Sequence, residues 1–245
     1  METGLVIKAN APEILDKQLK NRAAKNQYGI VVVGSATDAY MPHEQQWRMT
    51  ESLLKVLLKY RFPVFISTKR NLILRDIALL REIDAAAILP PDLQFVLKGG
   101  VILSVSISTM DDNITRMLEP GTIAPLQRME LVQQLQEEGF LTGVNAIPIL
   151  PFIADTDIEL EKIIAAASTH RANYILAGSL TLFGTAPADS KTLYYKFLEK
   201  QYPHLLAAYD KLYNGYPSVP RWYQQALAQR VSVLCNKYNI RNSII

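Results

Sequence analysis

Short apolar runs alternate with amphipathic stretches along most of this chain. The apolar runs are short, which favours strands, and they lie at 30–33, 63–67, 101–107, 142–150 and 173–177. Between them, apolar side chains recur three or four positions apart, as from Leu53 to Leu58, which indicates helices. Strands that alternate with helices predict a parallel sheet with right-handed crossovers. We therefore expect an α/β fold, either an open sheet or a partial barrel.

Some details of these elements can be predicted as well. Ile30 to Val33 are consecutive apolar β-formers, so we expect this strand to be buried on both faces. Pro148 and Pro151 are expected to break the fourth strand, because proline cannot donate to a sheet ladder. The short apolar run Leu5 to Ile7 precedes a helix that is expected to begin near Ala11.

The composition changes near Thr185, where the strand pattern ends. Eight of the twelve tyrosines follow this position. We expect residues 1–184 to form the sheet-containing domain and residues 185–245 to form a helical extension packed on it. The aromatic residues of this extension are interleaved with basic ones and could form a stacking surface for a nucleic acid, although we favour a packing role. The basic residues are Lys191, Lys196, Lys200, Lys211 and Arg221.

Composition and charge narrow the class of protein. An apolar fraction of 49% with 20% charged residues is typical of a folded globular chain. The net charge of +3 is small and does not favour a dedicated nucleic-acid binder. There is no apolar run of bilayer length and no signal-peptide pattern, so we expect a cytoplasmic protein without a membrane partner. Cys235 is the only cysteine; it cannot form an internal disulfide or hold an iron–sulfur cluster by itself, and we interpret it as a packed apolar residue.

Familiar catalytic and metal motifs are absent from the sequence. It contains no glycine-rich phosphate loop and no H-E-x-x-H, C-x-x-C or G-x-S-x-G pattern. His43, His170 and His204 are scattered and lack the spacing of metal ligands. We therefore assign no metal ligand and no catalytic residue.

Polar residues follow several of the predicted strands. Carboxyl ends of parallel strands meet at one edge of a sheet, so these residues should converge there. Lys69 would suit a carboxylate, Asp38 or Glu44 an amine, and the hydroxyls a sugar, as in a small zwitterion that carries a ribose. Alternatively, the same residues only cap helices and close turns. The set is Ser35, Thr37, Asp38, Glu44, Thr68, Lys69, Ser106, Ser108 and Asn145.

The spacing of these residues resembles a known family. The pattern G-S-x-T-D-x-Y-x-P-x-E from Gly34 to Glu44 is similar to a segment of DNA-repair-photolyase-like radical SAM proteins, which are relatives of spore photoproduct lyase. Further matches follow in order, and together they cover about residues 4–180. They are Val6 to Pro12, Thr68-Lys69 with Arg75-Asp76, Ser104 to Thr109, Arg116-x-x-Glu119-Pro120 with Arg128, and Pro148 to Pro151 with Asp155.

This resemblance implies a fold, a cofactor and a site. It implies a partial (β/α)6 TIM-like barrel of parallel strands, with a helical C-terminal tail, that binds S-adenosylmethionine (SAM) at the carboxyl ends of the strands. Thr37, Lys69 and Ser106 match the positions expected to hold the methionine and ribose parts, and Ser35 and Asp38 belong to the same loop as Thr37. The strand near Pro148 is expected to lie against the adenine.

The sequence also departs from the family. Radical SAM proteins hold a 4Fe–4S cluster with C-x-x-x-C-x-x-C on the loop after their first strand, and this chain has no such motif. We therefore expect the chain as written to be inactive in reductive SAM cleavage. Two interpretations stay open. One is a fragment of a radical SAM lyase-type enzyme whose first strand is missing; the other is a complete, cluster-free pseudoenzyme or binding protein.

Both interpretations leave the substrate undetermined, with nucleic acid among the candidates. Spore photoproduct lyase has a cysteine hydrogen donor in the T-D loop, where this chain has Ser35, so we do not expect repair of spore photoproduct. An uncovered amino-terminal barrel edge would favour dimerisation.

Overall fold

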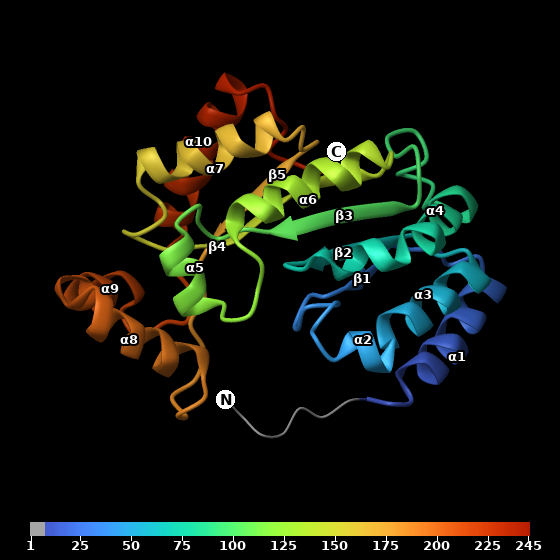
Figure 1. The fold of residues 1–245 in the computed structure, drawn as a ribbon, viewed down its shortest axis with the longest axis horizontal. Coiled ribbons are helices and arrows are strands. Elements are labelled where there is room, and N and C mark those ends of the chain that lie inside the picture. The colour runs from blue at the N-terminus through green and yellow to red at the C-terminus, as the bar shows by residue number, and fades with distance from the viewer. Residues whose placement is uncertain (1–7) are drawn as a thin grey trace. The chain divides into compact units, whose positions relative to one another are not determined.

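A computed structural model describes residues 8–245 of the chain. These residues form an α/β structure with a five-stranded parallel sheet in the order β1-β2-β3-β4-β5 (Figure 1). The predicted class, a partial TIM-like barrel with a helical C-terminal tail, is confirmed. The run Leu5 to Ile7 lies outside the described residues. The strands are β1 Val31–Val33, β2 Val64–Thr68, β3 Val101–Ser106, β4 Leu141–Ile149 and β5 Ile175–Ser179.

Helices connect the strands and form the tail. The chain separates into two compact units: one contains residues up to Ser104 together with Glu137–Leu141, and the other contains Val105–Gln136 and Thr142–Ile244. The helices are α1 Ala11–Ala24, α2 Glu44–Trp47, α3 Met49–Tyr60, α4 Ile77–Ala86, α5 Asp112–Leu118, α6 Pro125–Glu137, α7 Asp157–Thr169, α8 Ser190–Gln201, α9 Leu206–Tyr213 and α10 Arg221–Lys237, with short 3-10 helices at Asn71–Asp76 and Pro203–Leu205.

The first unit contains the paired strands β1 and β2. The strands run parallel, with Val31 opposite Val64 and Val33 opposite Ile66. Helix α3 packs against both α1 and α4 (Figure 1). Leu54 and Leu57 belong to the apolar stripe of α3 and are completely buried. The predicted amphipathic helix therefore turns its apolar stripe toward the core of this unit.

Strand β1 is less buried than its sequence predicts. The Val32 side chain is 54% exposed, so the expectation of burial on both faces is wrong for this strand. β1 is the first strand in the sheet order, and its alternate side chains point to opposite faces. Val32 therefore points to the opposite face of the sheet from Val31 and Val33, which are half-buried.

In the second unit, β4 and β5 pair in parallel, with Val144 opposite Ile175. Helix α10 packs against α7 and β5. The Thr156 side chain accepts a hydrogen bond from the Glu159 N–H and so caps α7. The fold of this unit thus brings the tail helix directly onto the last strand.

Pro148 does not break β4, contrary to expectation. The strand continues to Ile149, and its register against β5 shifts between Ala146 and Ile149. At such an irregularity the ladder does not need a donor at every position, so a residue without an N–H is accommodated.

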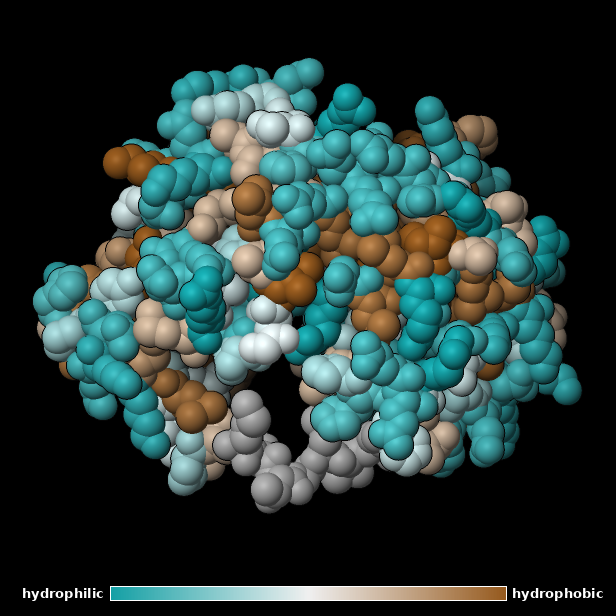
Figure 2. Space-filling view, viewed as in Figure 1, coloured by the Kyte–Doolittle hydropathy of each residue, from teal (hydrophilic) through white to brown (hydrophobic). Residues whose placement is uncertain are grey.

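The tail is helical, and several of its tyrosines are core residues. Tyr194, Tyr209 and Tyr213 are buried, which supports the packing interpretation for these rings. Other large apolar tail residues, such as Trp222, remain exposed. In the view of Figure 2, hydrophilic side chains cover most of the surface and apolar areas lie between them. No helix within residues 8–245 combines the length and the apolar character needed to cross a bilayer.

Candidate functional site

The loop after β1 folds closely onto the end of β2. Gly34 has φ +90°, and a Cβ at this position would lie 2.3 Å from the Ser67 carbonyl oxygen. Only glycine allows both this backbone conformation and this approach. The G-S-x-T-D loop therefore starts against the backbone of β2, within the first unit.

Asp38 joins this loop to the residues that follow β2. Its Oδ1 accepts hydrogen bonds from the Tyr40 N–H at 2.8 Å and from the Thr68 hydroxyl at 2.7 Å. Its Oδ2 accepts the Lys69 N–H at 2.7 Å. Thr68 Oγ1 in turn accepts the Arg70 N–H at 3.1 Å. The carboxylate thereby links two strand-end segments about 30 positions apart.

The loop presents other polar side chains to solvent. Ser35 and Thr37 are exposed, whereas Asp38 and Lys69 are half-buried. The predicted candidates of the first unit therefore divide into exposed hydroxyls at the tip of the loop and an aspartate at its base.

Glu44 is buried and organises the next segment. Its carboxylate accepts the backbone N–H groups of Met49 at 3.0 Å and Thr50 at 2.9 Å, at the start of α3, where a negative charge is favourable. Its Oε1 also accepts from Arg75 at 3.0 Å, and Arg75 binds Asp76 through two nitrogens at 2.8 Å each. These partners, Asp76 first, hold the pKa of the Arg75 guanidinium above its usual value. Glu44 thus serves the protein framework rather than an amine ligand.

In the second unit, a buried arginine supports the end of β3. Arg128 is 1% exposed and donates to the carbonyl oxygens of Ser106 and Ile123, each at 2.9 Å. It also forms an ion pair with Glu119, with 2.6 Å between Nη1 and Oε2. Ser106 and Ser108 are buried beside this group, and the Ser108 hydroxyl reaches Glu119 at 3.5 Å.

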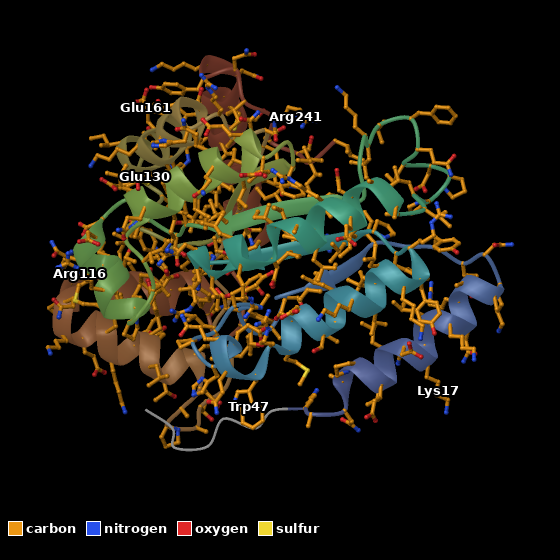
Figure 3. The ribbon with its side chains drawn as sticks, turned by 45° about the vertical axis from the view of Figure 1, so that its right-hand side comes forward. Lys17, Trp47, Arg116, Glu130, Glu161 and Arg241 are labelled. Atoms are coloured by element: carbon orange, nitrogen blue, oxygen red, sulfur yellow. The ribbon has the colours of Figure 1, made fainter. Side chains whose placement is uncertain are left out.

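Arg116, which belongs to the same sequence pattern, lies at the surface of α5. Its side chain is 74% exposed and pairs with Asp112 (Figure 3). Of the two arginines in the pattern, only Arg128 supports the strand end.

The segment after β4 is fixed to the tail. The Asp155 carboxylate accepts the Phe152 N–H at 2.6 Å and the Tyr223 hydroxyl, and the Asp155 carbonyl accepts from Arg230 at 2.7 Å. Burial, and then the bond to Asp155, raise the pKa of Tyr223 above its usual value. Asp155, which the sequence comparison singled out, therefore anchors helix α10.

Buried tyrosines make a second connection to the same segment. The Tyr209 hydroxyl donates to the Pro151 carbonyl at 2.6 Å and shares a hydrogen bond of 2.8 Å with the Tyr194 hydroxyl. The Tyr213 hydroxyl donates to the Leu180 carbonyl at 2.7 Å, just after β5. Burial raises the pKa of all three phenols, so they stay neutral donors at physiological pH. Composition revealed that tyrosines gather in the tail but not which carbonyls they bind.

The residues of the chain do not fit an iron–sulfur cluster. Cys235 is buried in α10, and burial raises its pKa to about 11, which opposes the thiolate that a metal needs. Within residues 8–245, no three or more His, Cys, Asp or Glu side chains gather in a metal-binding arrangement.

The chain is similar in sequence to proteins of other organisms. No family model matches the sequence. An uncharacterized protein of Mycobacterium tuberculosis, Rv2578c, is 26% identical over 239 residues, which are 98% of this chain and 65% of that protein. An uncharacterized protein of Methanocaldococcus jannaschii, MJ0683, is 26% identical over 153 residues, which are 62% of this chain and 50% of that protein. The chain thus spans less than two thirds of the length of these relatives.

Solved structures share the fold at low sequence identity. A spore photoproduct lyase variant with bound AdoMet and dinucleoside spore photoproduct has a TM-score of 0.60 and 13% identity, over 93% of this chain and 64% of that one. The chain therefore shares the fold of spore photoproduct lyase. SuiB of Streptococcus suis, bound to its precursor peptide SuiA, has a TM-score of 0.52 and 10% identity, over 97% of this chain and 42% of that one. The predicted likeness to the spore photoproduct lyase group is confirmed as a likeness of fold.

Proposed function

We propose that this chain binds S-adenosylmethionine at the carboxyl ends of its strands and belongs to a radical SAM protein of the photolyase-like group. The observation that carries the proposal is the likeness of fold to spore photoproduct lyase over 93% of the chain, in a structure that holds AdoMet. The ordered motifs of the sequence support it, because their polar residues lie at or just after strand ends. Ligands of open α/β structures bind at these ends.

We assign the ligand contacts by chemical type. The Lys69 ammonium would pair with the methionine carboxylate, and the hydroxyls of Thr37, Ser35 and Ser106 would bind the polar groups of the methionine and ribose parts. The half-buried Pro148 would lie against the adenine. Asp38 belongs to the same loop as Ser35 and Thr37.

Reductive cleavage of SAM is not part of the proposal for this chain alone. That reaction requires a cluster, and Cys235 does not fit one. Anaerobic reconstitution with iron and sulfide tests this point. A cysteine-ligated four-iron cluster in the absorption and Mössbauer spectra of the purified chain would show that it carries cluster ligands after all. The nucleic-acid substrate and the predicted dimer stay predictions.

Calorimetric titration with SAM tests the binding proposal. A charge-assisted hydrogen bond contributes about 1.5–3 kcal/mol, so Lys69→Ala should weaken SAM binding by roughly 10- to 100-fold. Lys17→Ala is a matched control, because Lys17 is an exposed lysine of α1 (Figure 3). No binding to the wild-type chain, or equal affinity of the Lys69 and Lys17 variants, would overturn the proposal or its central contact.

A further inference from the structure

Asp38 differs from the polar residues around it. Thr37 is exposed, whereas Asp38 is half-buried and turned toward the protein. Within the described residues, its carboxylate accepts hydrogen bonds from the Tyr40 N–H, the Thr68 hydroxyl and the Lys69 N–H, all at 2.7–2.8 Å. These are short, charge-assisted bonds, which are stronger than neutral ones.

The number of hydrogen bonds that a carboxylate can accept limits how many a ligand can still donate to it. Two oxygens offer about four lone-pair directions. Oδ1 receives Tyr40 and Thr68, and Oδ2 receives Lys69. Little capacity is left for an ammonium group, which would bring up to three donors of its own.

The donors also lie on both strand-end segments. Tyr40 belongs to the loop after β1, while Thr68 ends β2 and Lys69 follows it. The close approach of Gly34 to the Ser67 carbonyl brings the same two segments together from the other end of the loop. The carboxylate therefore fixes the backbone of Lys69 relative to the loop that carries Thr37.

We propose that Asp38 is a positioning residue, which holds Lys69 and Thr37 in the geometry that binds the amino-acid part of SAM without itself contacting the ligand. This inference rests on the proposed function. It explains the spacing of the T-D and T-K segments by one physical connection, the hydrogen bonds of the Asp38 carboxylate.

Asp38→Asn tests the connection with little change in shape. The asparagine oxygen can still accept from Tyr40 and Thr68, but its NH₂ group cannot accept the Lys69 N–H. Hydrogen exchange of the Lys69 amide should become at least about tenfold faster in the variant, without any ligand, because a hydrogen-bonded amide exchanges only when its bond opens. An unchanged exchange rate would overturn the proposed connection.

A double-mutant cycle then tests the role in binding. Asp38→Asn alone should weaken SAM binding by about fivefold or more, and it should add little in a Lys69→Ala background, because both changes remove the same contact. Additive effects would show that Asp38 binds SAM directly and would overturn the positioning role. Asp84→Asn is the matched control. Asp84 Oδ1 also accepts a backbone N–H, from Val101 at 2.8 Å, but at the start of β3 and not at the carboxyl end of a strand. If the wild-type chain does not bind SAM, the proposed function fails, while the exchange result still decides whether Asp38 holds Lys69.

Discussion

The buried guanidinium of Arg128 and the half-buried carboxylate of Glu119 form an ion pair, with 2.6 Å between Nη1 and Oε2. The pair lies where the backbone of β3 ends, because Arg128 also donates to the Ser106 carbonyl. Two sequence segments that match one family pattern are thus connected by a single side chain. Its burial makes it sensitive to substitution.

Arg128→Met should lower the free energy of unfolding by about 3–5 kcal/mol, because it leaves the Glu119 carboxylate without its partner in a poorly hydrated site. Chemical denaturation followed by circular dichroism measures the change. Adding Glu119→Gln should recover part of the loss, since the unpaired charge is then removed. Arg116→Ala is the control: its exposed pair with Asp112 should contribute little. An equal loss in the Arg116 and Arg128 variants would contradict the interpretation.

Tyr209→Phe should destabilise the second unit by about 1–3 kcal/mol, because the Pro151 carbonyl and the Tyr194 hydroxyl lose a buried partner. Thermal unfolding measures the effect. Tyr195→Phe removes a hydroxyl that binds Asp210 near the surface, so it should change the melting temperature much less. The reverse order would show that the tail is not held through Tyr209.

The fold could largely be predicted from local pattern. Short apolar runs marked the strands, and β-branched residues, which pack well on a pleated surface, are frequent in β1 to β4. The errors arise where residues far away in the sequence determine the local structure. Tyr174 pairs with Arg241 in an isolated bridge, so β5 as a regular strand begins at Ile175 rather than at 173. Val32 is 54% exposed although it stands in an apolar run, because exposure depends on whether other elements cover its face of the sheet, which the run itself does not reveal.

The candidate site was predictable in residue type but not in role. We chose Asp38 and Glu44 as ligand-binding candidates because they are acids near a strand end. In the structure, both carboxylates instead accept hydrogen bonds from backbone N–H groups of the protein. The donors to Asp38 at Thr68 and Lys69 lie about 30 residues away, and periodicity carries no information about such contacts. Likewise, the spacing of Asp155 gave no indication that Tyr223 is its partner.

Asp84 should make stability depend on pH. Burial raises the pKa of this carboxyl above 3.8, although hydrogen bonds from Val101 and Gly100 oppose the shift. A folded-state pKa above the unfolded value means that the unfolded chain loses its proton first, so this group destabilises the fold as pH rises from the unfolded-state pKa to the folded-state pKa. The melting temperature of Asp84→Asn relative to wild type should therefore be higher at pH 7 than at pH 3. A difference that is independent of pH would contradict the burial of this charge.

Cys235 should resist modification in the folded protein. Burial raises the pKa of its thiol to about 11, so about one thiol in a thousand is ionised at pH 8. Ellman's reagent should label the native chain very slowly and the guanidinium-unfolded chain at once. Tyr223→Phe, which weakens the attachment of α10 to Asp155, should speed labelling, whereas Tyr195→Phe should not. Rapid labelling of the native wild-type chain would show that α10 is not packed as described.

Comparing Gly34 with Gly139 separates the cost of a strained backbone conformation from the cost of a steric clash. Their φ angles are +90° and +94°, so alanine is strained at either position, by about 1–2 kcal/mol. Among the described residues nothing lies within 4 Å of a Cβ at Gly139, whereas a Cβ at Gly34 would lie 2.3 Å from the Ser67 carbonyl oxygen. Gly34→Ala should therefore cost more than Gly139→Ala in the free energy of unfolding, or displace the loop that carries Thr37 and Asp38. Denaturation of both variants, with Lys69 amide exchange as the local measurement, checks this. Equal costs and unchanged exchange would mean that the loop does not need its close approach to β2.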